Sequence, residues 1–275
     1  MRRSWAAAAA LALSACGGTG VHQAAETTPT TAATGTTPAT RDIPATVATA
    51  SDDRPAAEPA APGRPVAQWL RVGGLAAPGL GAVRPPTLVV YADGRAIAGA
   101  AHELRLPPAE VEALVKALDQ DLAGQPATAS PRPGSPTFHD APMTILGVDG
   151  GGGMREVHVP YLEHAASRYD AALLTARDRL SHLAARVTAR GRTYSTDRVR
   201  LSAERLASSE TTAEPLPEGV PLPPETQATS ARKDYKGHKA TAITRLVPGD
   251  GSWHVYRLPT GGHLALSWRY LLPHE

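Results

Sequence analysis

The sequence predicts an α+β protein in which an antiparallel sheet built of hairpins carries two amphipathic helices on one face. Two pairs of strand-like segments, each pair joined by a glycine-containing turn, predict the sheet. Apolar residues that recur at intervals of three and four over two long stretches predict the helices. Each helical stripe needs an apolar surface to pack against, and one face of a sheet supplies it.

The first hairpin is predicted between residues 87 and 97. Its first strand, TLVVY at 87–91, is rich in β-branched and aromatic residues, and Ala96-Ile97 begins the second. Asp93-Gly94 lies between them and is a strong hairpin signal, because glycine tolerates positive φ.

The first helix is predicted to begin at Pro107 and Pro108 and to end before Gly124 and Pro126. Proline suits the first turn of a helix because its φ is already helical and its missing N–H costs nothing there. The residues between these limits form one apolar face of about four turns: Val111, Leu114, Val115, Leu118 and Leu122.

A second hairpin and a second helix are predicted to follow. The strands are 143–148 and 155–159, and Asp149 with the four glycines after it forms the turn. The helix is predicted over 163–187, where apolar residues step by four and three: Tyr169, Leu173, Ala176, Leu180, Leu183 and Val187. The first folded unit, 66–190, therefore has the predicted order ββαββα.

Residues 191–275 are predicted to form a C-terminal unit that is less regular. Its expected parts are a strand, a Pro-rich connector, a short helix and a final hairpin, at 194–201, 208–227, 239–246 and 252–271. The strands either complete the first sheet or form a small sheet of their own. One continuous α+β domain is the preferred interpretation.

The N-terminus has the pattern of a bacterial lipoprotein signal. Two arginines precede a mostly apolar stretch at 5–15, too short for a membrane-spanning helix of about 20 residues. The stretch leads into LSAC at 13–16, which resembles the lipobox of bacterial lipoproteins. We expect cleavage of residues 1–15 between Ala15 and Cys16, and diacylglycerol on the Cys16 sulfur. An ordinary secretory signal with an incidental cysteine is the alternative.

Residues 16–65 are predicted to be the lipid-bearing cysteine followed by a disordered linker of Thr, Ala and Pro. The linker has no aromatic residue, so it buries too little apolar surface to offset the entropy of ordering. Its Thr/Pro tract resembles those that some actinobacteria O-mannosylate; an unmodified linker is the alternative.

Cys16 is the only cysteine, which excludes an intramolecular disulfide. The expected location is the extracytoplasmic face of the cell membrane, lipid-anchored.

Charge and histidine spacing limit the expected partners. Without Arg2 and Arg3 of the leader, the 28 basic side chains fall to 26, equal to the 26 acidic ones. No basic stripe points to nucleic acid; the densest basic stretch, 186–200, is interpreted as a solvated helix end, with anionic lipid or wall polymer as the alternative. The expected partners are the membrane, through diacylglycerol on Cys16, and an envelope protein or wall polymer.

The ten histidines show no tight metal-ligand pair, so no metal or cofactor is predicted. His158 and His164 nevertheless flank a strand end and could meet.

Four blocks of sequence resemble a group of uncharacterised actinobacterial secreted proteins and lipoproteins. They are PTLVVYADGRAI at 86–97, the helix opening LPP at 106–108, DAPMTILGVDGGGG at 140–153 and WRYLLPHE at 268–275. Tyr270 stands where the tail of that group usually has proline. The resemblance implies an exported location and the same order of blocks. It implies no site residues, because the group carries no assigned activity.

The sequence offers one candidate binding surface and no catalytic residue. The surface consists of aromatic side chains in the final hairpin: Trp253, Tyr256, Trp268 and Tyr270. They are interpreted either as an exposed face for a glycan or protein, or as core. His139-Asp140 is the one acid–base pair considered, but no Gly-x-Ser-x-Gly elbow accompanies it, so no enzyme activity is predicted. The hypotheses are a non-enzymatic binding or envelope-associated module, a cell-envelope hydrolase with an unrecognised site, and a folded spacer.

Overall fold

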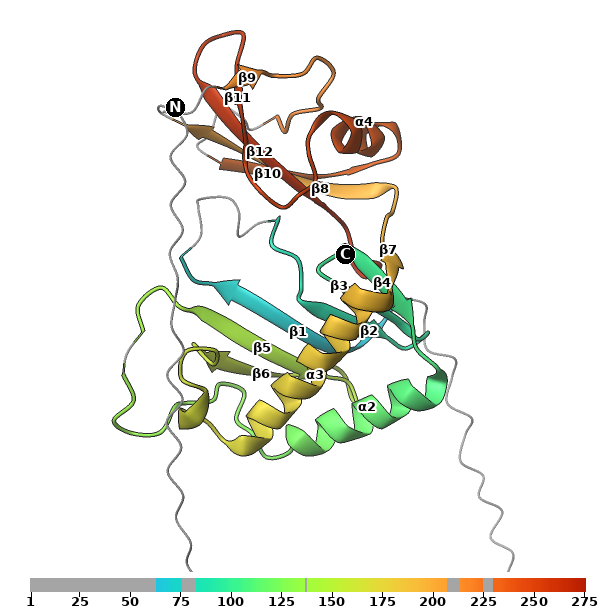
Figure 1. The fold of residues 1–275 in the computed structure, drawn as a ribbon, viewed down its shortest axis with the longest axis vertical. Helices are drawn as coiled ribbons and strands as arrows, with labels where there is room; N and C mark the ends of the chain where they lie inside the picture. The colour runs from blue at the N-terminus through green and yellow to red at the C-terminus, as the bar shows by residue number, and fades with distance from the viewer. Residues whose placement is uncertain (1–62, 76–82, 137, 207–212, 225–229) are drawn as a thin grey trace, which may run out of the picture. The chain divides into compact units, whose positions relative to one another are not determined.

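The computed structural model describes residues 63–75, 83–136, 138–206, 213–224 and 230–275. The predicted signal peptide, Cys16 and the linker up to residue 62 lie outside the described residues. Within the described part the chain is α+β, as predicted: two sheets of mostly antiparallel strands are accompanied by three α-helices (Figure 1). None of the described helices is long and apolar enough to cross a membrane.

The first sheet has seven strands in the order β6-β5-β1-β2-β3-β4-β7, and every neighbouring pair is antiparallel. Its strands are β1 (Pro65–Gly73), β2 (Leu88–Tyr91), β3 (Arg95–Ala98), β4 (His102–Arg105), β5 (Pro142–Val148), β6 (Arg155–Pro160) and β7 (Arg192–Thr193). Strand β1 pairs with both β2 and β5, so it joins the two predicted hairpins into one sheet. Sequence analysis predicted neither β1 nor β4.

The two hairpin turns are confirmed, and each has a physical reason for its sequence. Gly94 has φ of +88°, and a Cβ there would lie 2.6 Å from the carbonyl oxygen of Leu106. In the second turn the Asp149 carboxylate accepts the N–H groups of Gly151 and Gly153 at 2.8 and 3.1 Å. Those amides are therefore already bonded within the turn, as expected for a hairpin turn.

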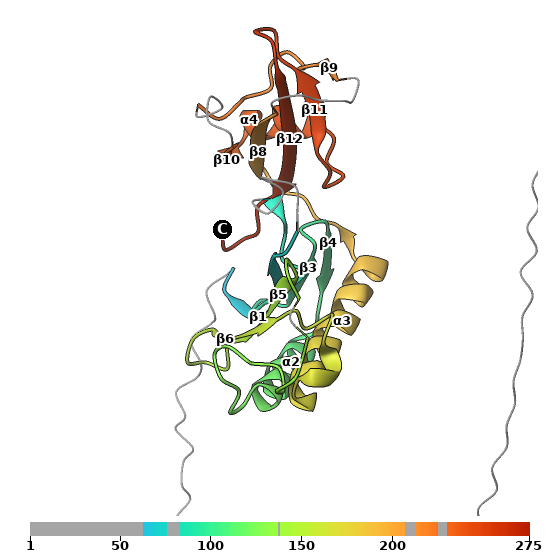
Figure 2. The same cartoon turned by 90° about the vertical axis from the view of Figure 1, so that its left-hand side faces the viewer.

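Helices α2 (Pro108–Asp121) and α3 (Ala171–Arg190) cover one face of the first sheet (Figures 1 and 2). Their apolar stripes join the inward residues of β1, β2, β5 and β6 in the larger core. Helix α3 begins later than predicted, because Asp170 is extended and a short 3-10 turn, Ala166–Arg168, precedes it. Tyr169 is still buried there, and its hydroxyl donates a hydrogen bond to the Pro160 carbonyl at 2.6 Å.

The second sheet has five strands in the order β10-β8-β12-β11-β9. They are β8 (Arg198–Leu206), β9 (Glu214–Pro215), β10 (Ser230–Lys236), β11 (His254–Arg257) and β12 (His263–Tyr270), with α4 (His238–Leu246) packed against β8 and β10. The C-terminal strands thus form a sheet of their own, one of the two expected arrangements. Strand β10 escaped prediction because it is mostly charged and buries only Ala231 and Tyr235.

The C-terminal residues pack against the face of the first sheet opposite the helices, where Figure 2 shows the C-terminus. Leu272 is buried there with Val89 and Tyr91, which alternate along β2 with the residues that face the helices. The Tyr91 hydroxyl lies 2.8 Å from Nδ1 of His274, within hydrogen-bond distance. The segments YADGR and WRYLLPHE, which carry much of the resemblance, therefore contact each other.

Candidate functional site

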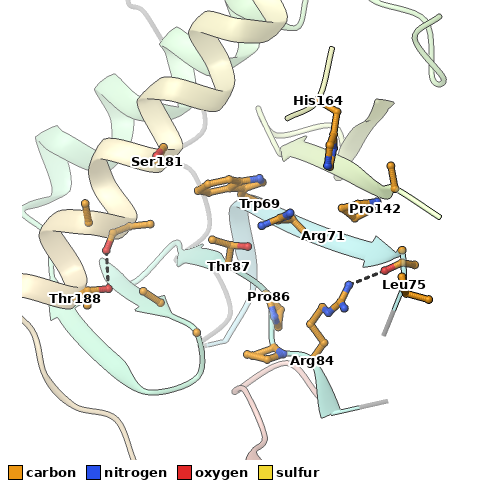
Figure 3. Close-up of a pocket in the computed structure, with 18 of the residues that line it drawn as sticks. Trp69, Arg71, Leu75, Arg84, Pro86, Thr87, Pro142, His164, Ser181 and Thr188 are labelled. Carbon is orange, nitrogen blue, oxygen red and sulfur yellow. Dashed lines mark hydrogen bonds between the residues drawn. The ribbon is translucent and has the colours of Figure 1, made fainter. Parts of the chain in front are cut away.

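A wide groove of about 940 Å³ lies beside α3 on the helix-bearing face of the first sheet (Figure 3). Trp69 and Arg71 of β1 form its floor; they stand two residues apart and so point to the same face of the sheet. One side of helix α3 forms a wall of the groove. The side chains on this wall are small: Ser181, Ala184, Ala185 and Thr188. Small residues here leave open space above the floor, which larger side chains would fill.

Besides residues 73–75 at the end of β1, four segments form the rest of the rim. They are 84–87 before β2, 99–102 between β3 and β4, 138–142 before β5, and His164 after β6. The backbone N–H of Leu75 donates to the Asp140 carbonyl at 2.7 Å, which ties the end of β1 to the loop before β5. The groove is therefore built on a paired sheet and a helix, a scaffold that can hold a ligand-binding geometry.

Trp69 carries an unpaired polar group in this groove. Its side chain is only 9% exposed, and its indole N–H has no hydrogen-bond partner among the residues that the structure describes. Leaving a buried donor unpaired costs about 1–3 kcal/mol, so most native structures avoid it. In Figure 3 the nitrogen edge of the ring points toward the side of the groove that holds His164 and Pro142. An acceptor placed there by a ligand would satisfy it.

The polar side chains of the groove are mostly basic. Arg71, Arg84, His102, His139 and His164 line it, whereas Asp140 is the single acidic lining residue of the described part. Arg84 donates one hydrogen bond to the Gly73 carbonyl at 2.6 Å. The exposed Arg71 guanidinium makes no hydrogen bond or ion pair to any described residue. The groove thus offers two guanidinium groups against one carboxylate, together with imidazole and hydroxyl groups that can donate or accept hydrogen bonds.

The acid–base pair considered in the sequence, His139 and Asp140, lies at this rim. His139 and Asp140 are both exposed lining residues. No hydrogen bond joins them to each other or to Ser181 among the described residues. Asp140 has φ of +57°, and its carbonyl group shapes the loop through Leu75.

Two of the four aromatic residues proposed as a binding surface are core residues instead. Tyr256 is 5% and Trp268 is 9% exposed, and both pack in the core of the second sheet under α4. The Trp268 indole N–H donates to the Val247 carbonyl at 2.8 Å, so its polar group is satisfied internally. For these two residues the core interpretation fits and the exposed-surface interpretation does not, because Trp268 lies on the same face of β12 as Leu264 and Leu266, which pack with α4.

The other two aromatic residues are half-buried. Trp253 precedes β11, and Tyr270 ends β12 with its ring edge-on to Trp268 and to Tyr194, at centroid distances of 5.1 and 6.2 Å. Trp268, Tyr270 and Tyr194 also line a smaller cavity of about 520 Å³. The four side chains therefore do not form one exposed aromatic face.

Three of the histidines have structural neighbours. His158 lies 3.2 Å from Glu156, and the tilted ring of His164 lies with its centroid 5.5 Å from that of Phe138. His254 lies 2.9 Å from Asp250. No group of three or more His, Cys, Asp or Glu in the described part could hold a metal ion.

Three of the five arginines in the basic stretch 186–200 form ion pairs. Arg186 pairs with Glu110, and Arg192 pairs with Glu103 at 3.1 Å. Further along, Arg200 pairs with an aspartate of β10 at 2.8 Å. These pairs agree with the interpretation of the stretch as a solvated helix end and its continuation.

Sequence reasoning did not single out the floor of the groove. Trp69 and Arg71 follow a Pro- and Ala-rich stretch, and their spacing of two is the only local signal of a shared strand face. That signal does not show that a helix wall and four loops surround the same face. His139 and Asp140 were considered for catalysis, and the structure places them at the rim instead.

Fold and site together define an α+β protein whose first sheet carries a basic, donor-rich groove beside a helix. No family model, curated protein or solved structure matches the chain.

Proposed function

We propose that this chain is a lipoprotein held by diacylglycerol on Cys16 to the extracytoplasmic face of a bacterial cell membrane, with a folded part that acts as a non-enzymatic binding module. The LSAC sequence after a short apolar stretch supports the anchor. The resemblance to actinobacterial secreted proteins and lipoproteins supports the exported location. A flexible linker of this length would span on the order of 40 Å, enough to hold the folded part away from the lipid surface.

The groove beside α3 is the observation that carries the binding function. Ligand sites are typically concave, largely apolar and supplied with a few converging polar groups. This groove has apolar and small walls, and it brings together the unpaired Trp69 N–H and the unpaired Arg71 guanidinium. It lacks a hydrogen-bonded nucleophile and base among the described residues, which favours binding over catalysis.

Site-specific crosslinking on intact cells tests this proposal. A photo-crosslinking amino acid at Thr188, an exposed groove residue, is expected to capture a ligand or partner. The same amino acid at Ala189, the next and also exposed residue of α3, lies outside the groove lining and serves as the matched control. Equal capture at both positions, or none at Thr188, would contradict the proposal.

The anchor has its own test. Cells fed a clickable fatty acid are expected to label the wild-type protein and to retain it in the membrane fraction. Cys16→Ala is expected to lose both the label and the membrane association, because the thiol that carries the lipid is gone. A labelled, membrane-bound Cys16→Ala protein would contradict the anchor.

A cell-envelope hydrolase is the second candidate, favoured only by the position of His139 and Asp140 in the groove lining. It predicts turnover of ester or cell-wall substrates that falls when either residue is replaced by alanine. The binding proposal predicts no turnover by the wild-type protein in the same assays.

A further inference from the structure

We infer that the groove beside α3 binds small organic anions that carry a carboxylate or phosphate next to an apolar group. This inference rests on the proposed binding function and names its ligand class. It starts from the balance of charged groups: two arginines and one aspartate line the described part of the groove, together with three histidines. A ligand that brings negative charge and acceptors complements such a surface.

The floor of the groove provides the recognition point for the anion. Figure 3 shows Trp69 and Arg71 next to each other on β1, with the His164 ring directed toward them from the rim. The site thus has two hydrogen-bond donors without partners among the described residues. One is the buried indole N–H of Trp69, and the other is the guanidinium of Arg71. A single carboxylate or phosphate group has enough oxygens to accept from both.

The rim provides the apolar contact. Leu75 is 86% exposed, which is unusual for a large apolar side chain, and it lies on the groove together with Phe138 and Pro86. These side chains stand at the margin, whereas Trp69 and Arg71 form the floor. A ligand with its charged group on the floor would place an attached apolar group against them.

Isothermal titration calorimetry on the full-length protein in detergent tests the inference with three probes: phenyl phosphate, benzoate and the neutral benzyl alcohol. We expect both anions to bind more tightly than the alcohol, and their affinity to fall as salt is raised. Arg71→Gln is expected to weaken anion binding by about tenfold or more, the loss typical of a hydrogen bond to a charged group. Arg71→Lys, which keeps the charge, is expected to retain part of the affinity.

A second arginine provides the matched control. Arg105 is also exposed on a strand of the first sheet but does not line the groove, so Arg105→Gln is expected to leave anion affinity unchanged. Trp69→Phe removes the unpaired N–H and keeps an aromatic ring, and it is expected to weaken anion binding as well. Both variants are checked for folding by circular dichroism.

Two results would overturn the inference. The first is benzyl alcohol binding as tightly as the anions, with no effect of Arg71→Gln; the groove would then bind ligands, but not through their charge. The second is no binding of any probe, in which case crosslinking at Thr188 still decides separately whether the groove has a partner.

Discussion

Replacing Glu275 by glutamine should destabilise the protein in a way that depends on pH. Its carboxylate accepts two hydrogen bonds of 2.6 Å from Arg269 and one of 2.8 Å from the Leu272 N–H. Arg200 lies 3.3 Å away on β8, and the Glu275 side chain is only 17% exposed. The carboxylate therefore ties the C-terminal segment to strands β8 and β12 of the second sheet.

The pKa of Glu275 sets the magnitude of the expected loss of stability. Burial alone would raise this pKa, but the hydrogen bonds from Arg269 and Leu272 and the charges of Arg269 and Arg200 lower it to about 2, from an ordinary value of 4.5. Because the folded-state pKa is the lower one, the ionised carboxylate favours folding. Its contribution is fully present above about pH 4.5 and is lost as the pH falls through 2. At neutral pH this corresponds to about 3 kcal/mol.

Urea unfolding followed by tryptophan fluorescence measures the effect. Glu275→Gln is expected to lower the free energy of unfolding by about 3 kcal/mol at pH 7. At pH 3 the expected loss is roughly half of that, because this pH lies between the two pKa values and the ionised carboxylate contributes only part of its stabilisation. Glu218→Gln, at an exposed position with no ion pair to any residue of the described part, is the control and should change little. A difference below about 0.5 kcal/mol at pH 7, or one that does not shrink at pH 3, would refute this reasoning.

Three further substitutions, with Gly99→Ala as a control for the first, probe the fold of the first sheet and its helices. Gly94→Ala should cost about 1–3 kcal/mol because its Cβ would meet the Leu106 carbonyl at positive φ, whereas Gly99→Ala, with φ of +59° and open space, should cost less; thermal unfolding of the pair checks this. Leu118→Ala, at a fully buried position of α2, should lower the free energy of urea unfolding by about 2–5 kcal/mol. Asp149→Asn should lose an ion pair and weaken two amide hydrogen bonds. Burial opposes ionisation of Asp149, but its hydrogen bonds hold the pKa below the ordinary 3.8, so its contribution is present above that pH and is lost in acid, as unfolding curves at pH 7 and pH 3 would show.

Local chemistry explains which elements the sequence predicted correctly. The stripe of α2 is a property of a dozen consecutive residues, and Pro108 begins the helix as expected. The Asp93-Gly94 turn depends on the φ of one glycine. The second sheet was harder to predict, because β10 is mostly charged and gains its two buried residues only by pairing with β8.

The sequence by itself determined the helical stripes and the two hairpin turns, because each depends on residues that are close together in the chain; the lipid anchor at Cys16 stays a prediction of the same local kind. Only the tertiary structure decided that β1 pairs between two hairpins, that Trp268 is covered by α4, and that Trp69 and Arg71 share a groove with loops up to 95 residues away at His164. The physical reason is that strand pairing and burial of one face depend on partners distant in sequence, and no short-range pattern specifies them.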